Sequence, residues 1–322
     1  MSSQQRTLIV HDGPNGYIEG LKTQFPDHRF ELCLENETVE DAITRVDPTI
    51  ALAFRSGRFP GPAHIHLLNA PNIKWFQSGG AGIDHLPHWN KNALTVTNAA
   101  GVSGKYMAET VTGAVLLMNF DFPKFIEDQR NRVWDPQDWT SLDQKTALVI
   151  GLGGIGSRVA ERLKLFGMRV LGTRNSSKPC NHVDALIPMS DILGALPQAD
   201  FVCIHVPNTE MTQNLVNKKF LAAMKPSARL INTARGAQVD EGALIEALRA
   251  GQISGAYIDV YDKEPLPQNS PLWNTPNLIM SPHVSDQIAG WEKNSARFFG
   301  ENFKRYLKAV PLHNICNPDL GY

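Results

Sequence analysis

Short apolar segments alternate with segments of helical periodicity along the whole chain. Apolar runs such as TLIV (7–10) and IALAF (50–54) occur in the first hundred residues, and runs such as ALVI (147–150) and AYIDV (256–260) occur further along. Continuous apolar strands separated by helices are typical of parallel sheets that are covered on both faces. The pattern therefore predicts an α/β protein with two doubly wound parallel-sheet domains.

Two long helical segments lie on either side of the second set of strands. Residues 103–120 carry small or apolar side chains at helical spacing, and residues 289–310 form an amphipathic pattern with Ala296, Phe299, Phe303 and Leu307 on one face. We expect the second helix to return the chain to the first domain, which would then be discontinuous. The predicted domains are residues 1–101 with 286–322, and residues 102–285.

Composition and charge narrow the class of protein. A hydrophobic content of 42% with 20% charged residues is typical of a globular protein, and the net charge of −1 argues against general nucleic-acid binding. No apolar run approaches the roughly 20 residues that span a membrane. The four cysteines are scattered without a CxxC pair, which indicates neither a metal site nor a disulfide framework. We expect a cytoplasmic protein without metal, nucleic-acid partner or membrane association.

A glycine-rich turn follows the apolar run 147–150. Gly151, Gly153 and Gly156 have the G-x-G-x-x-G spacing, with a strand before them and a helical pattern after them. Such glycines allow a tight turn, a close approach of the backbone to a pyrophosphate, and close packing of helix on strand. A methyltransferase turn is the competing interpretation. We predict dinucleotide binding by Gly151, Gly153, Gly154, Ile155 and Gly156.

The next strand ends in an arginine where an acid is usual. No Asp or Glu occurs between Arg162 and Val183, and the strand runs into Arg174. An acid here would bind the ribose 2′-hydroxyl of NAD, whereas an arginine can pair with the 2′-phosphate of NADP. The alternative is a solvated surface arginine. We predict that NADP is favoured over NAD, with Arg174, Asn175 and Ser176 in the cofactor loop.

Three ionisable residues each follow an apolar strand of the second domain. Arg235, Glu264 and His283 are expected at the carboxyl edge of the sheet, where ligands bind, although each alone has a purely structural interpretation. Together they suit the reduction of a 2-keto acid. His283 would donate the proton, Glu264 would orient its ring and raise its pKa, and Arg235 would hold the substrate carboxylate.

Several motifs occur in an order that resembles the D-isomer-specific 2-hydroxyacid dehydrogenases. They are IKWFQSGGAGIDHL (73–86), GLGGIG (151–156), INTARGAQVDEGAL (231–244), DVYDKEPLP (259–267) and SPHVSD (281–286). The resemblance implies a Rossmann cofactor domain inserted into a discontinuous, flavodoxin-like substrate domain. It also implies the catalytic roles given above for Arg235, Glu264 and His283. The SPHVSD segment departs from the usual PHIAGAT form, which puts the surroundings of His283 in doubt.

The resemblance also assigns further binding residues. Main-chain N–H groups of Gly80, Ala81 and Gly82 would receive the substrate carboxylate, as such loops form anion nests. Arg55 is either close to the substrate or a surface residue. Asp259 would face the nicotinamide carboxamide, and the remaining residues expected to line the cofactor are Pro207, Thr233 and Ala234.

The resemblance implies an NAD(P)-dependent oxidoreductase acting on a small 2-keto or D-2-hydroxy acid, of the glyoxylate or hydroxypyruvate class. Formate and phosphite oxidation are alternative chemistries. A homodimer formed through the cofactor domain is also implied. Trp134 and Trp139 lie in a segment that could cross between subunits, and packing in the core is the favoured interpretation of their side chains. The alternative from another class is a nucleotide-sensing protein, like the transcriptional corepressors built on this fold.

Overall fold

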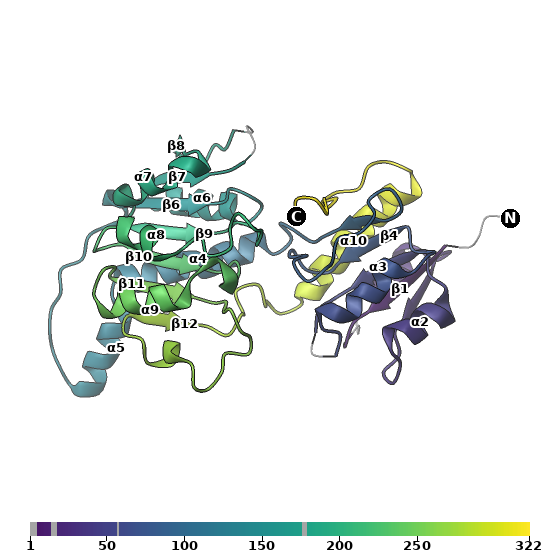
Figure 1. Cartoon of the computed structure of the whole chain (residues 1–322), viewed down its shortest axis with the longest axis horizontal. Coiled ribbons are helices and arrows are strands. Elements are labelled where there is room, and N and C mark those ends of the chain that lie inside the picture. The colour runs from purple at the N-terminus through teal and green to yellow at the C-terminus, as the bar shows by residue number, and fades with distance from the viewer. Residues whose placement is uncertain (1–4, 14–17, 57, 176–178) are drawn as a thin grey trace. The chain divides into compact units, whose positions relative to one another are not determined.

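The computed structural model describes residues 5–13, 18–56, 58–175 and 179–322, and its contacts divide the chain into two units (Figure 1). Unit 1 consists of Met1–Val102 and Ala289–Tyr322, and unit 2 of Ser103–Ile288. The boundaries expected from the sequence, after residues 101 and 285, lie close to these divisions.

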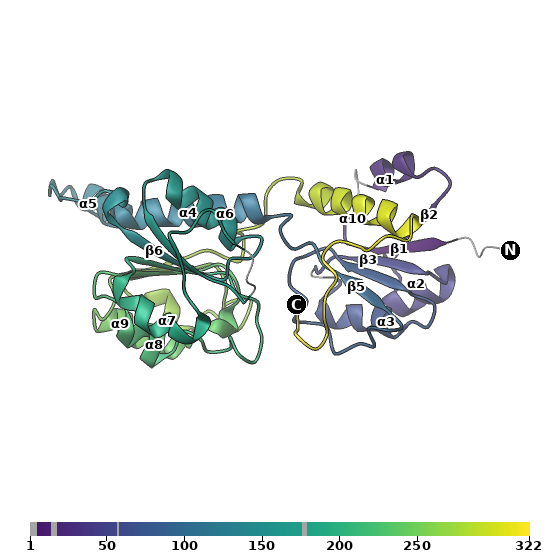
Figure 2. The ribbon, with the colours of Figure 1, turned by 90° about the horizontal axis from the view of Figure 1, so that it is seen from above.

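Unit 1 is built on a parallel sheet with the strand order β2-β1-β3-β4-β5, which is the flavodoxin-like order. Helices α1 and α10 cover one face, and α2 and α3 cover the other (Figure 2). The elements are β1 (Arg6–Val10), α1 (Ile18–Gln24), β2 (Arg29–Leu32), α2 (Val39–Val46), β3 (Ile50–Ala53), α3 (Ile65–Asn69), β4 (Trp75–Ser78), β5 (Thr95–Thr97) and α10 (Trp291–Leu307).

Helix α10 returns the C-terminal part of the chain to unit 1. Its aromatic face packs on the sheet: the ring of Phe299 stacks on that of Trp75 with centroids 5.0 Å apart, and Phe303 lies beside both. Leu307 was expected on the same face, but the helix ends at this residue and its side chain is 54% exposed. The predicted face was therefore wrong at its last position, because the periodicity continues in the sequence beyond the last turn that packs.

Unit 2 is built on a second parallel sheet, with the order β12-β11-β10-β9-β6-β7-β8. This is the Rossmann order with one further strand at an edge. The predicted fold class, two doubly wound parallel-sheet domains, is confirmed. The elements are α4 (Gly104–Asn119), α5 (Phe122–Asn131), β6 (Thr146–Ile150), α6 (Gly156–Leu165), β7 (Arg169–Thr173), β8 (Ala185–Leu186), α7 (Ile192–Ala195), β9 (Phe201–Ile204), α8 (Lys218–Ala223), β10 (Arg229–Asn232), α9 (Glu241–Arg249), β11 (Gly255–Ile258) and β12 (Leu278–Met280).

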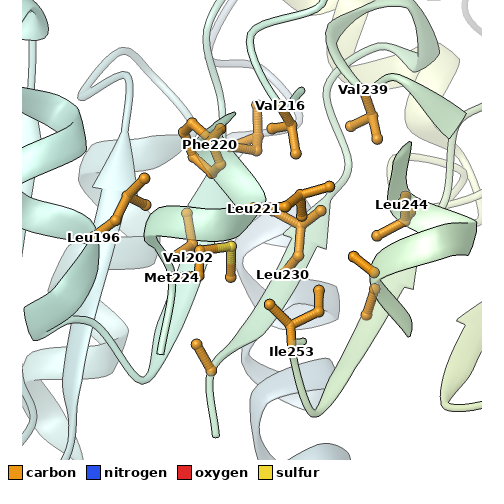
Figure 3. Close-up of a cluster of buried hydrophobic side chains, with 14 of the residues drawn as sticks. Leu196, Val202, Val216, Phe220, Leu221, Met224, Leu230, Val239, Leu244 and Ile253 are labelled. Carbon is orange, nitrogen blue, oxygen red and sulfur yellow. The ribbon is translucent and has the colours of Figure 1, made fainter. Parts of the chain in front are cut away.

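The core of unit 2 lies on both faces of its sheet. On one face, Val202 of β9 and Leu230 of β10 pack against Phe220 and Leu221 of α8 and Leu244 of α9 (Figure 3). On the other, the sheet packs against α4 and α6. Burying each such Leu or Phe contributes about 1.5–3 kcal/mol. The packed core therefore holds the central strands in place. It also fixes the positions at their carboxyl ends, where the loops of the site begin.

The described residues contain neither a membrane-spanning helix nor a cluster of metal ligands. None of the helices is both long and apolar enough to cross a membrane. In the same part of the chain, no group of three or more His, Cys, Asp or Glu residues is arranged to hold a metal ion.

Candidate active site

The site is organised around a hydrogen bond between Glu264 and His283. Glu264 follows β11 and His283 follows β12, and these neighbouring strands are parallel, so both residues leave the sheet at its carboxyl edge. Nδ1 of His283 lies 2.6 Å from Oε2 of Glu264. The main-chain N–H of Tyr261 donates to Oε1 at 3.0 Å. The carboxylate is thus held at both oxygens, and Nε2 of His283 has no hydrogen bond to any described residue.

The pKa values of His283 and Glu264 are shifted in opposite directions. The hydrogen bond to Glu264 raises the pKa of His283 above its usual value of 6.5, although partial burial and the charge of Arg235 oppose the shift. Burial favours the neutral form of Glu264, but the hydrogen bonds from His283 and Tyr261 outweigh it and lower the pKa of the carboxyl group. Both shifts favour the ion pair. The imidazolium therefore keeps its proton at a higher pH than an isolated histidine would.

Arg235 reaches the same edge from β10. A Cβ on the next residue, Gly236, would lie 1.9 Å from the carbonyl carbon of Tyr261, so glycine is required where the loop after β10 lies against the loop after β11. The amide of Asn232 donates to the carbonyl of Arg235 at 2.9 Å and fixes its main chain. The three predicted catalytic residues thus come from adjacent strands of unit 2, and their catalytic roles remain predictions.

The loop that carries His283 is bound to Asp259, a buried residue that follows β11. His283 has a φ of +52°, a left-handed conformation that costs a residue with a side chain about 1–3 kcal/mol. Its N–H donates to the carbonyl of Asp259 at 2.8 Å. The N–H groups of Val284 and Ser285 donate to the two carboxylate oxygens at 2.9 and 3.0 Å. Asp259 therefore stabilises the turn, and its contact with a nicotinamide carboxamide remains a prediction.

The glycine-rich turn joins β6 to α6. Gly151 has a φ of +99°, and a Cβ on Gly156 would lie 2.1 Å from the carbonyl oxygen of Gly151. Gly153 differs, because a Cβ there would meet no atom within 4 Å. No side chain caps the N-terminus of α6. The turn is therefore tightly packed at Gly151 and Gly156 and open at Gly153. This arrangement fits a pyrophosphate bound over Gly153, Gly154 and Ile155.

The same edge holds buried polar atoms that have no partner within the described structure. Among them are the hydroxyl of Thr233, after β10, and both ring nitrogens of His205, after β9. Burial lowers the pKa of His205 to about 4, so its ring is neutral near pH 7. Buried polar groups are rarely left unsatisfied, and these fit the polar groups of a bound dinucleotide. His205 was missed from the sequence, although it directly follows an apolar strand, as the other candidates do.

The remaining cofactor candidates are placed as follows. Arg174 directly follows β7, and Thr173 before it accepts hydrogen bonds from the N–H groups of Gly151 and Leu152. The guanidinium of Arg174 lies 3.4 Å from the carbonyl of Pro179. Its position is therefore beside the glycine-rich turn. Asn175 is exposed, Ser176 lies outside the described residues, and Pro207 and Ala234 lie in the loops after β9 and β10.

The predicted substrate-binding residues lie in unit 1. Gly80, Ala81 and Gly82 follow β4, and the carbonyls of Gly80 and Ala81 accept hydrogen bonds from Ala99 N–H at 2.9 Å and from the Asn98 amide at 2.8 Å. Among the described hydrogen bonds, none uses the N–H groups of residues 80–82. The loop is thus held by its carbonyls, with its N–H groups available to an anion. Arg55 is exposed just after β3.

Comparisons with known proteins agree on the family. The model of the D-isomer-specific 2-hydroxyacid dehydrogenase, NAD-binding domain, matches residues 112–285. A glyoxylate reductase of Thermofilum pendens is 35% identical over 262 residues, covering 78% of this chain and 77% of that protein. The chain belongs to the D-isomer-specific 2-hydroxyacid dehydrogenases. It is an oxidoreductase that uses a nicotinamide cofactor, as the order of its motifs predicted.

Solved structures of the family share the whole fold. A D-isomer-specific 2-hydroxyacid dehydrogenase family protein of Aeromonas salmonicida has a TM-score of 0.86 and 32% identity, covering 98% of this chain and 100% of that one. A D-isomer-specific 2-hydroxyacid dehydrogenase of Xanthobacter autotrophicus, solved with NADPH and MES, has a TM-score of 0.83 and 28% identity, covering 98% and 99%.

The substitution Glu264→Gln tests the electrostatic pairing in the dehydrogenase. Removing the carboxylate charge should lower the pKa of His283 toward or below 6.5, because its raised value comes chiefly from that hydrogen bond. The pKa is measured by NMR titration of the ring protons. Glu246→Gln, at an exposed ion pair with Lys218, is the matched control. An unchanged pKa of His283 in the Glu264 variant would contradict the pairing.

Proposed function

We propose that the enzyme reduces a small 2-keto acid of the glyoxylate or hydroxypyruvate class to the D-2-hydroxy acid, with NADPH as the preferred reductant. The observation that carries the proposal is the His283–Glu264 hydrogen bond of 2.6 Å at the carboxyl edge of the cofactor-domain sheet. A relative with 35% identity is a glyoxylate reductase, which supports the choice of a small keto acid.

Each residue of the pair has a defined part in this reaction. The bound cofactor would supply a hydride to the keto carbon. Nε2–H of His283 donates a proton to the keto oxygen, and Glu264 stabilises the imidazolium beforehand and fixes the ring. Arg235 pairs with the substrate carboxylate through its planar fork and orients the carbonyl. General acid catalysis of this kind contributes about 10²–10⁴-fold to the rate.

The glycine-rich loop of unit 1 is assigned to the substrate carboxylate. Its carbonyl groups are engaged by Asn98 and Ala99, so the N–H groups of Gly80, Ala81 and Gly82 are those left to bind an anion. Arg55 follows the neighbouring strand β3 and adds positive charge to the same unit. The N–H groups would contact the substrate carboxylate directly, and Arg55 would attract it at longer range.

His283→Ala should lower kcat for keto-acid reduction about a hundredfold or more, with the dissociation constant of NADPH nearly unchanged, because the histidine acts on the reacting oxygen. Initial rates are measured with glyoxylate, hydroxypyruvate, pyruvate and phenylpyruvate. His88→Ala, at an exposed histidine of unit 1, is the control. A loss below about tenfold removes His283 as the donor. A wild-type enzyme that reduces none of these acids contradicts the proposed reaction.

The preference for NADP is supported by Arg174, which stands directly after β7 where an acid would favour NAD. The Xanthobacter relative was solved with NADPH. Arg174→Ala should lower kcat/KM for NADPH by roughly 10- to 100-fold, the equivalent of a hydrogen bond to a charged group, and leave kcat/KM for NADH almost unchanged. Arg169→Ala, at the opposite end of β7, is the control. Equal losses with the two cofactors would contradict a contact with the 2′-phosphate, and no loss with either would assign Arg174 to the surface.

A homodimer formed through the cofactor domain is supported by an apolar surface on α5 and the segment after it. Helix α5 has no buried residue among those described, and Trp134 is 94% exposed. Large exposed apolar surfaces usually mark interfaces. Light scattering should give the mass of two chains, and the mass of one chain would contradict the proposal. The exposed side chains are Phe122, Phe125, Ile126, Val133, Trp134 and Trp139.

We also assign the enzyme to the cytoplasm. Its four cysteines are free thiols, and Cys33, Cys203 and Cys316 are buried, which suits a reducing compartment. Cell fractionation tests this assignment, and recovery of the protein outside the cytoplasmic fraction would contradict it.

A further inference from the structure

We propose that Tyr257 and Ser281 are positioning residues for His283, acting through Asp259 by a directed chain of hydrogen bonds that begins in the core of unit 2. This inference rests on the proposed role of His283 as the proton donor. The catalytic roles of Arg235, Glu264 and His283 do not involve the side chains of Tyr257 and Ser281.

The last step in this series of hydrogen bonds joins Asp259 to the loop that carries His283. Asp259 accepts hydrogen bonds from the main-chain N–H groups of residues 283, 284 and 285, one at its carbonyl and two at its carboxylate. Asp259 therefore determines the path of the polypeptide backbone from His283 to Ser285. A rotation of this carboxylate would release two of the three bonds and leave His283 in its left-handed conformation without support.

The orientation of that carboxylate is set by Ser281. The hydroxyl Oγ of Ser281 lies 2.5 Å from Oδ1 of Asp259 and 2.7 Å from the hydroxyl of Tyr257. An ionised carboxylate only accepts hydrogen bonds, and a serine hydroxyl has a single proton to donate. Ser281 therefore donates to Asp259, and the phenol of Tyr257 must donate to Ser281. The direction of the chain is Tyr257 to Ser281 to Asp259.

The first link is anchored in the core. Tyr257 lies on β11, where it pairs in register with Ile279 of β12, and only 8% of it is exposed. Its ring belongs to the apolar cluster beneath α4 and α6. A second tyrosine, Tyr261, donates from its hydroxyl to the carbonyl of Ser281 at 2.8 Å. Two tyrosines therefore fix Ser281, which lies two residues before His283 in the sequence.

The same network reaches the partner of His283. The N–H of Tyr261 donates to Oε1 of Glu264, so the tyrosine that holds Ser281 also holds the carboxylate on which the imidazole depends. The distance of 2.6 Å between His283 and Glu264 thus requires the two loops to keep their relative position. The hydroxyl chain on one side and the Tyr261 backbone on the other maintain it.

The test compares Tyr257→Phe, Ser281→Ala and the double variant with wild type. Each single change should lower kcat for keto-acid reduction about fivefold, the rate equivalent of one neutral hydrogen bond. The pKa of His283 should fall, because a loosened loop weakens its bond to Glu264. The charges of Arg235 and Asp286, which also act on His283, are the same in all variants.

The double variant and two controls separate positioning from general stability. Because Tyr257 acts through Ser281, the double variant should be no slower than Ser281→Ala alone. Ser281→Thr keeps the hydroxyl and should restore both the rate and the pKa. Tyr306→Phe, at a tyrosine packed on Trp75 in unit 1, should change neither.

Two results with an active wild-type enzyme would overturn the inference. One is a lowered melting temperature in Tyr257→Phe and Ser281→Ala with the pKa of His283 and kcat both unchanged, since that is a purely structural role. Another is a full multiplicative loss in the double variant. A wild-type enzyme that reduces no keto acid would refute the proposed function instead, and in that case the NMR titration of His283 alone decides: an unchanged pKa in the variants overturns the positioning role.

Discussion

The parallel direction of the strands in unit 2 is the constraint on which the site depends. Because every strand runs the same way, each loop that leads out of a strand leaves the sheet at one edge. The glycine-rich turn, Arg174, Arg235, Glu264 and His283 are far apart in the sequence and share this edge for that reason. The apolar strands buried on both faces hold the edge rigid, so the position of each loop follows from the packing of the core.

At this edge of the sheet, two carboxylates have different roles at His283. Glu264 faces the ring, raises its pKa and fixes which nitrogen is left for a substrate. Asp259 faces the main chain and stabilises a conformation that a residue with a side chain rarely adopts. Strain of this kind is common where a side chain must be presented at a particular point. The chemistry that we propose therefore depends on an electrostatic pair and on a backbone turn that keeps the pair together.

The sequence predicted the features that depend on backbone requirements. The G-x-G-x-x-G turn could be found because its glycines meet steric needs, and the fold class because buried parallel strands have a recognisable composition. The prediction of the buried face of α10 was correct up to Phe303 and wrong at Leu307. The sequence does not show where the packed part of the helix ends. Tyr257 gave no signal, because a tyrosine in an apolar strand is ordinary. Its contact with Ser281 depends on side-chain orientation, which periodicity does not encode.

The pH dependence of kcat/KM in the two directions shows whether His283 carries the proton. Reduction needs the imidazolium and oxidation needs the neutral ring of the same residue. We expect reduction to slow as the pH rises through the pKa of His283, which lies above 6.5, and oxidation to accelerate over the same range. Rates that do not vary between about pH 6 and 9, or a transition below 6.5, would contradict the assignment of His283 as the group that carries the proton.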